Sequence, residues 1–236
     1  MRLAKSKSFN LNNEALLEVK DSSNVQASTP EEEKPEDIYA EELKIIKGFQ
    51  APKLEDIQSR RVFLGEKSKK YTLLLDLDET LILSRNFPKE AIERFGGSLG
   101  TIIRPYTREL LEALSDLYEI VIFTASCEEY AYQMTNIIDP EHKFIKKVIA
   151  KEHCLPTGTG YYVKDLRVIA DRSLDEMLIA DNSIISFAFQ LANGITVSSY
   201  DGKEEDMELS YLTNYLTELY NKDNIVESNR SSIGLI

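Results

Sequence analysis

Between about residues 60 and 222, short apolar runs alternate with segments whose apolar residues recur at helical spacing. The runs have the length and β-branched character of buried strands, and each ends in polar residues. We predict strands at 71–77, 118–124, 144–150, 177–180 and 195–197. The spacing of apolar residues predicts helices at 107–117, 128–138 and 204–220.

Strands that are separated by helices pair in parallel and need cover on both faces of the sheet. The pattern therefore predicts an α/β fold, a three-layer, Rossmann-like domain with a central, mostly parallel sheet, over residues 67–222. In such folds the functional groups gather at the carboxyl ends of the strands.

Both ends of the chain differ from this domain. Residues 1–40 are polar and acidic, and they hold too little apolar surface to offset the entropy cost of ordering, so we expect disorder there. We expect residues 41–66 to form a linker with one short amphipathic helix, and residues 223–236 to form a flexible tail.

The charge balance narrows the class of partner. The chain carries 28 Lys and Arg against 40 Asp and Glu, a net charge of −12, which argues against direct nucleic-acid binding. No apolar run approaches the roughly 18 residues of a membrane span, and the polar first residues lack the apolar core of a secretory signal. Two cysteines are too few for a disulfide scaffold and favour a reducing compartment.

Polar side chains follow the predicted strands at the points where they end. Asp76 and Asp78 follow the first run, Thr124 closes the second, and Asp181 follows a later one. Lys164 comes after a pair of tyrosines. Neighbouring parallel strands would bring these groups to one edge of the sheet. Carboxylates that come close need a cation, and Mg²⁺ accepts one or two carboxylates together with phosphate and water.

Such a set of groups can transfer a phosphoryl group. One aspartate could attack phosphorus and form an aspartyl-phosphate, and the second could protonate the leaving alkoxide and then activate water. A lysine and a threonine could hold the remaining phosphoryl oxygens. Taken singly, each residue is more often a helix cap, a turn residue or a surface residue. The prediction depends on their joint occurrence at the strand ends.

Other readings of the acidic pattern fail on spacing. A calcium-binding loop that begins at Asp76 would need Gly at its sixth place and Glu at its twelfth, where the chain has Leu81 and Phe87. A Gly-rich loop with Lys-Ser/Thr is missing, which excludes a P-loop NTPase. Receiver domains use a similar chemical set, but in them the hydroxyl and the lysine follow the acidic residues. Here Asp181 comes after the lysine, which disfavours a receiver domain.

Four segments carry a resemblance to a known family: DLDETL at 76–81, FTAS at 123–126, YYVKDL at 161–166 and ADNS at 180–183. The first resembles the D-x-D-x-T signature of haloacid-dehalogenase-type phosphatases. Together, in this order, they resemble the small members of the RNA polymerase II C-terminal-domain phosphatase-like family. The resemblance covers about residues 70–220 and implies the haloacid-dehalogenase-type fold.

The resemblance implies a catalytic role at five positions. Asp76 matches the nucleophile, and Asp78 matches the general acid and base. Thr80 matches the residue that supports the nucleophile loop. Thr124 matches a donor to the phosphoryl oxygens, and Lys164 matches the cation that offsets the charge of nucleophile and phosphate.

The resemblance also implies Mg²⁺ as the cofactor, with candidate ligands or supports at Asp76, Asp78 (through its main-chain carbonyl), Asp181 and Asn182. The chain departs from the family pattern at two informative places. Lys151 stands where small members often have Arg, which keeps the charge at a substrate-contacting position but loses the bidentate fork. Tyr106 stands where an Arg-Pro-Gly element commonly has Gly.

The segments from Leu81 to Arg104 and from Thr124 to Lys164 are too short to hold a cap domain. An uncapped site would admit phosphoserine or phosphothreonine in an extended protein segment, and the RNA polymerase II C-terminal domain is one candidate. The implied function is a Mg²⁺-dependent protein serine/threonine phosphatase in nucleus or cytoplasm. Two alternatives stay open, a capless phosphatase for a small or lipid-linked phosphate and a non-catalytic scaffold. The sequence carries no signal for the oligomeric state.

Overall fold

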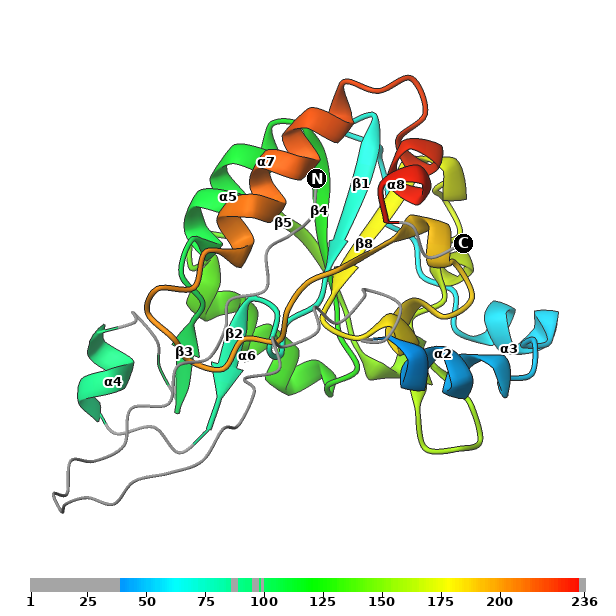
Figure 1. Ribbon diagram of the computed structural model, residues 1–236, viewed down its shortest axis with the longest axis horizontal. Coiled ribbons are helices and arrows are strands. Elements are labelled where there is room, and N and C mark those ends of the chain that lie inside the picture. The colour runs from blue at the N-terminus through cyan, green and yellow to red at the C-terminus, as the bar shows by residue number, and fades with distance from the viewer. Residues whose placement is uncertain (1–38, 86–88, 95–97, 99, 234–236) are drawn as a thin grey trace, which may run out of the picture.

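The computed structural model describes residues 39–85, 89–94, 98 and 100–233. Its centre is a five-stranded parallel sheet in the order β5-β4-β1-β8-β9 (Figure 1). The strands are β1 (Tyr71–Leu75), β4 (Tyr118–Phe123), β5 (Ile145–Ile149), β8 (Met177–Asp181) and β9 (Gly194–Thr196). Every residue of β1 is buried, as expected for the middle strand of a sheet that is covered on both faces. The predicted α/β class and parallel sheet are confirmed.

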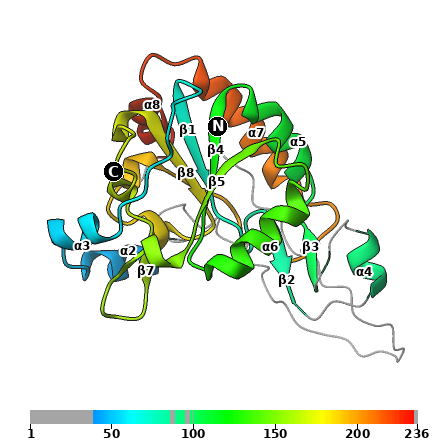
Figure 2. The same cartoon turned by 180° about the vertical axis from the view of Figure 1, so that it is seen from behind.

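Three helices cover one face of the sheet: α5 (Thr107–Ser115), α6 (Glu128–Ile138) and α7 (Glu208–Tyr220) (Figure 2). Their apolar stripes pack against Leu73 and Leu75 of β1 in one continuous cluster. Helix α7 begins four residues later than the leucine spacing predicts. The carboxylate of Asp206 accepts the main-chain N–H of Glu208 at 3.1 Å, so the chain forms a turn over residues 206–208 before the helix begins.

Shorter elements cover the other face. They are α2 (Ala40–Lys47), α3 (Leu54–Ser59) and the 3₁₀ helices η1 (Lys151–His153), η2 (Leu166–Val168), η3 (Leu174–Glu176), η4 (Ile184–Phe187) and η5 (Leu191–Asn193). Apolar residues of all of these elements except η1 form a second cluster with Leu74, Val121 and Ile179 of the sheet. The segment predicted to be a linker with one helix therefore forms two helices, and Leu43 and Ile46 of α2 pack against this cluster.

Two small hairpins and one short helix flank the carboxyl edge of the sheet (Figure 1). Antiparallel β2 (Ile82–Ser84) and β3 (Thr101–Ile103) lie on one side of it, with α4 (Lys89–Arg94) between them in sequence. The second hairpin pairs β6 (Leu155–Pro156) with β7 (Tyr162–Val163). In the described part of the chain these insertions contain no cap domain.

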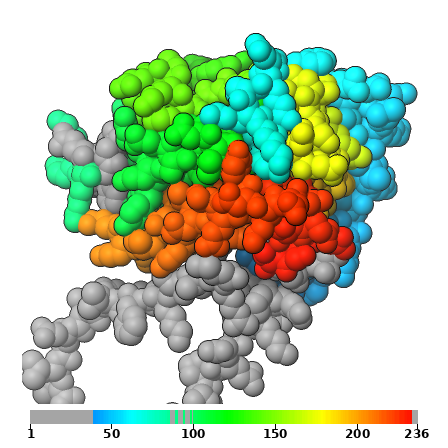
Figure 3. Space-filling view, turned by 90° about the horizontal axis from the view of Figure 1, so that it is seen from above, coloured from blue at the N-terminus to red at the C-terminus, as the bar shows by residue number. Residues whose placement is uncertain are grey.

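The last described segment forms helix α8 (Ile225–Ile233), where the sequence predicted a flexible tail. Ile225 and Asn229 are fully buried. The side-chain amide of Asn229 donates to the carbonyls of Ala192 and Gly194 at 2.8 and 2.9 Å, which joins the helix to the edge of the sheet. Figure 3 shows α7 and α8 as one band across the domain. Few residues of α8 face inward, Ile225, Asn229 and the partly buried Val226 among them, and so weak a pattern is not revealed by periodicity.

Most of the N-terminal segment that was predicted to be disordered lies outside the described residues. Within the described part of the chain, each helix is too short or too polar to cross a membrane.

Candidate active site

A buried lysine lies between two buried aspartates at the carboxyl edge of the sheet. The ammonium of Lys164 donates to a carboxylate oxygen of Asp76 at 2.5 Å and to one of Asp181 at 2.6 Å. Asp76 follows β1 and Asp181 ends β8, and these two strands are neighbours. The exposed fractions of the three residues are 6%, 1% and 2% for Asp76, Asp181 and Lys164. The structure thus brings together three of the residues that the sequence predicted from separate segments.

Burial and charge set the pKa values within this cluster. Burial raises the pKa of Asp76 to about 7, against the opposing attraction of Lys164. Burial alone would lower the pKa of Lys164, but attraction to Asp181 and Asp76 outweighs it and raises that pKa above the ordinary lysine value. The lysine is therefore a permanent cation. One ammonium faces two carboxylates, so the cluster can accept further positive charge.

The loop after β1 is fixed around Asp76. Thr80 is fully buried, and its hydroxyl donates to the second carboxylate oxygen of Asp76 at 2.9 Å. Between them Glu79 adopts a left-handed conformation with φ of 59°, a sparsely populated region for a side chain other than glycine. The amide of Tyr200 donates to the carbonyl of Glu79 at 2.7 Å and holds this turn. Both oxygens of Asp76 are thereby oriented by the protein.

Asp78 lies at the more exposed side of the same loop. Its carboxylate accepts hydrogen bonds from the hydroxyl of Ser126 at 2.8 Å and from that of Tyr130 at 2.5 Å. The Tyr130 hydroxyl also contacts Ser84 of the β2–β3 hairpin. Burial, followed by the hydrogen bond to Asp78, raises the pKa of Tyr130, so this phenol stays protonated and donates. Sequence reasoning missed Tyr130, which lies one helical turn beyond the FTAS motif and reads there as an ordinary helix residue.

Thr124 and Lys151 border the site from β4 and from the start of η1. Thr124 is buried, and its hydroxyl oxygen accepts the amide of Ser126 at 3.1 Å, so its O–H can point elsewhere. The amide of Lys151 donates to the carbonyl of Ser126 at 3.0 Å. The ammonium of Lys151 lies 4.4 Å from the ring centre of Tyr162, beside the strand that leads to Lys164.

The remaining predicted residue, Asn182, follows Asp181 directly. Its amide nitrogen donates to the hydroxyl of Ser199 at 2.9 Å and lies 3.5 Å from the carboxylate of Glu79. This orientation leaves the amide oxygen, a hard donor, for another partner. In the described part of the chain no three His, Cys, Asp or Glu side chains are grouped so that they alone would hold a metal ion.

Arg104 is a second residue whose role the sequence did not reveal. Its side chain is fully buried and binds the carboxylate of Asp206 through two nitrogens, each at 2.9 Å. The same guanidinium donates to the carbonyls of Thr80 and Ser198 at 3.1 and 2.8 Å. Arg104 thus joins the loop after β1 to the segment before α7, and it supports the candidate site from behind.

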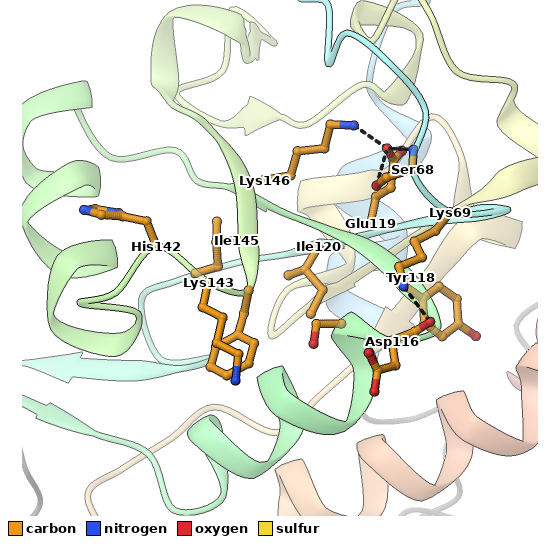
Figure 4. A pocket seen from close by; sticks show the side chains of 12 residues that line it. Ser68, Lys69, Asp116, Tyr118, Glu119, Ile120, His142, Lys143, Ile145 and Lys146 are labelled. Atoms are coloured by element: carbon orange, nitrogen blue, oxygen red, sulfur yellow. Dashed lines mark hydrogen bonds and ion pairs between the residues drawn. The ribbon is translucent and has the colours of Figure 1, made fainter.

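The opposite, amino edge of the sheet carries a hollow of about 510 Å³ between the segments around Ser68, Asp116 and His142 (Figure 4). Two of its lysines already bond to other groups of the hollow. The Lys69 ammonium donates to the Asp116 carbonyl at 2.9 Å, and Lys146 pairs with Glu119. None of the predicted site residues lines this hollow, so it is separate from the candidate active site.

Comparisons with known proteins agree with this arrangement of the candidate active site. The model of the family described as NLI interacting factor-like phosphatase matches residues 71–226. The chain belongs to this family. The matched region begins at β1 and ends in α8, so it contains the whole parallel sheet and the insertions between its strands.

Three curated relatives are similar over the same part of the chain. CTD small phosphatase-like protein 2 of Dictyostelium discoideum is 39% identical over 166 residues, which cover 67% of this chain and 29% of that protein. CTD small phosphatase-like protein 3 of Caenorhabditis elegans is 35% identical over 176 residues, covering 70% and 61%. Carboxy-terminal domain RNA polymerase II polypeptide A small phosphatase 1 of Homo sapiens is 31% identical over 169 residues, covering 68% and 64%. The chain therefore spans less than two thirds of the length of each of them.

Proposed function

We propose that the protein is a Mg²⁺-dependent phosphatase that removes phosphate from phosphoserine or phosphothreonine in proteins through an aspartyl-phosphate. The observation that carries the proposal is the buried Asp76–Lys164–Asp181 cluster at the carboxyl edge of the sheet. A scaffold has no need of a lysine buried between two aspartates, whereas phosphoryl transfer needs a nucleophile and a fixed cation together.

In the first half-reaction a carboxylate oxygen of Asp76 attacks phosphorus, and the bond from phosphorus to the seryl or threonyl oxygen breaks. Thr80 and Lys164 hold the nucleophile in place. Asp78, in its protonated form, gives its proton to the leaving alkoxide. The O–H of Thr124 and the ammonium of Lys164 hold the phosphoryl oxygens as charge moves onto them.

In the second half-reaction Asp78 takes a proton from water, and the water oxygen attacks phosphorus. The bond between phosphorus and the Asp76 oxygen breaks, which restores the carboxylate and releases phosphate. Ser126 and Tyr130 hold the carboxyl group of Asp78 on the open side of the loop, where leaving group and water must approach. Asp78 can serve first as acid and then as base because it is left deprotonated once the leaving alkoxide has taken its proton, and the proton that it takes from water restores the acid for the next turnover.

The donor set fits Mg²⁺. Two buried carboxylates share one ammonium, and burial raises the pKa of Asp76 to about 7, which is the behaviour of a carboxylate that lacks full compensation. Asp76, Asp181, the main-chain carbonyl of Asp78 and the side chain of Asn182 would hold the ion. Bound Mg²⁺ would neutralise the charge that phosphate brings to the cluster.

The substrate class follows from the short insertions. The described residues between β1 and α5 form the small β2–β3 hairpin and α4, which supports access of a bulky polypeptide to the loop after β1. Lys151 lies beside the exposed Tyr162 at the border of the site, which supports a contact between its ammonium and the substrate. The C-terminal domain of RNA polymerase II, which the names of relatives mention, is a candidate substrate.

The test compares hydrolysis of p-nitrophenyl phosphate, a phosphoserine peptide and a phospho-sugar, each with Mg²⁺ and with EDTA. We expect the wild type to hydrolyse the first two only with Mg²⁺ and to prefer the peptide to the sugar. Asp76→Asn removes the nucleophile and should abolish turnover while circular dichroism stays unchanged. Asp175→Asn, which alters an exposed aspartate of η3, is the matched control and should keep full activity. Equal, metal-independent rates in wild type and Asp76→Asn would refute the proposal in favour of a scaffold, and preference for the sugar would favour the small-molecule alternative.

A further inference from the structure

Helix α2 lies before the region that the family model matches, yet it packs at the carboxyl edge of the sheet. Its residues contact η4, and Leu43 and Ile46 join the second apolar cluster. Figures 1 and 2 both place α2 beside this edge, on the other side from the β2–β3 hairpin. At the end of the segment Phe49 packs against the rings of Tyr161 and Phe189, with ring centres 6.1 and 6.4 Å apart. The helix is therefore held by apolar contacts of its own.

The turn that α2 covers holds two charged residues of the site. The amide of Ser183 donates to the carboxylate of Asp181 at 2.9 Å, at the oxygen that does not bind Lys164. The main-chain amide of Lys164 donates to the carbonyl of Ser186 in η4 at 2.6 Å. The positions of the aspartate and of the lysine therefore both depend on the placement of residues 183–186.

One side chain of α2 bonds directly to this turn. The hydroxyl of Ser183 donates to a carboxylate oxygen of Glu42 at 2.7 Å, across 141 positions of sequence. Glu42 is half-buried. A hydrogen bond to a charged acceptor is among the stronger ones in proteins. The contacts then run without a break from Glu42 through Ser183 to Asp181 and Lys164.

We propose that Glu42 is a positioning residue for the candidate metal and phosphate site, and that α2 is a functional part of the catalytic unit. Glu42 acts through Ser183 on the orientation of Asp181. The inference rests on the proposed function, since it assigns Asp181 to the metal. Groups that orient metal ligands in this way commonly affect metal affinity by about 10-fold or more when removed.

The experiment measures Mg²⁺ binding by isothermal titration calorimetry and the Mg²⁺ dependence of p-nitrophenyl phosphate hydrolysis, both on the full chain. Glu42→Ala should weaken Mg²⁺ about 10-fold in both measurements. Glu42→Gln keeps an oxygen that accepts from Ser183, so it should stay within about twofold of the wild type. Glu41→Ala alters the exposed neighbour on the same helix and should behave as the wild type.

Ser183→Ala removes the other end of the same hydrogen bond. It should reproduce the effect of Glu42→Ala, and the double variant should bind Mg²⁺ no more weakly than either single variant, because one bond is lost in all three. Thermal melts without Mg²⁺ check that the variants fold. A purely structural role of Glu42 would lower the melting temperature without changing Mg²⁺ affinity.

Two results would overturn the inference: Mg²⁺ affinity of Glu42→Ala within twofold of the wild type, or Glu42→Gln as weak as Glu42→Ala. The second would show that charge acts instead of the hydrogen bond. Failure of the proposed function has a different signature, because the wild type itself would then bind Mg²⁺ without hydrolysing any phosphate ester. An active wild type with an unaffected Glu42→Ala would overturn the positioning role alone.

Discussion

Glu119 of β4 is a buried carboxylate far from the candidate active site, and its replacement by Gln gives a sharp test of the electrostatics of the fold. Its side chain is fully buried. It accepts two hydrogen bonds from Arg172, at 2.7 and 3.0 Å, and one from the amide of Ser68 at 2.8 Å. Thr72 and Lys146 complete its surroundings. Gln offers one oxygen and one N–H₂ group, so its N–H₂ group faces other donors. The buried Arg172 then keeps only the partly exposed Asp171, at 3.5 Å, as a counter-charge.

The magnitude follows from the pKa of Glu119. Burial opposes ionisation, but the hydrogen bonds of Arg172, Lys146 and Ser68 outweigh it and lower the pKa from 4.5 to about 2. Each unit of pKa shift corresponds to about 1.4 kcal/mol, so the native contacts of the carboxylate contribute about 3 kcal/mol to the free energy of unfolding. Because the folded pKa is depressed, this contribution is complete above the unfolded pKa of about 4.5 and is lost as pH falls toward 2.

The assay is urea unfolding followed by circular dichroism, since the chain has no tryptophan for fluorescence. At pH 7 Glu119→Gln should lower the free energy of unfolding by about 3 kcal/mol, and the difference from the wild type should shrink between pH 4.5 and 2. Glu176→Gln breaks the partly exposed pair with Lys67 and should cost at most about 1 kcal/mol. Equal losses in the two variants, or a difference from the wild type that persists at pH 2, would refute the reasoning.

Three further predictions concern the candidate active site and its surroundings. Tyr106 has a left-handed φ of 66° directly before α5. Tyr106→Gly should therefore raise the free energy of unfolding by about 0.5 to 1 kcal/mol, whereas Tyr106→Ala keeps the backbone strain and should not. A Gly variant that is less stable than the wild type in urea titration would contradict this prediction. Asp78→Asn should block proton transfer to the leaving group and from water. Stopped-flow and steady-state kinetics on a phosphoserine peptide test this, and rates at the wild-type level would show that the assignment is wrong. Tyr130→Phe removes one donor to Asp78 and keeps the ring, so kcat should fall about 10-fold with an unchanged melting temperature, and an unchanged kcat would count against a role of the phenol.

The sequence was most informative where a local pattern meets a general rule of folding. Apolar runs such as Tyr71–Leu75 predict buried strands, and helices between them predict parallel pairing, which places the ends of β1 and β8 at one edge. Asp76 and Asp181 were therefore expected to meet, and they do, with Lys164 between them. The resemblance to a family added the expected role of each residue, and the short segments between the motifs added the expectation of an uncapped domain.

Contacts between distant segments could not be read from the chain in this way. From the sequence alone, Glu42 would be taken for a solvent-exposed helix residue, Tyr130 for an aromatic residue of the core and Asn229 for part of a polar tail. The tertiary structure places the first against Ser183, the second against Asp78 and the third against β9. Periodicity reports which side of an element is apolar, but it carries no information on which polar group of another element lies opposite.

The sequence by itself determined the class of fold and the chemical set of the site, because apolar patterning and strand order act through short-range rules. Only the tertiary structure decided how that set is supported. It buries Arg104 behind the loop after β1, bonds Ser126 to Asp78 and brings α2 to the turn after β8. The physical reason is that a buried polar group must find partners wherever packing brings them, and packing is a property of the whole chain.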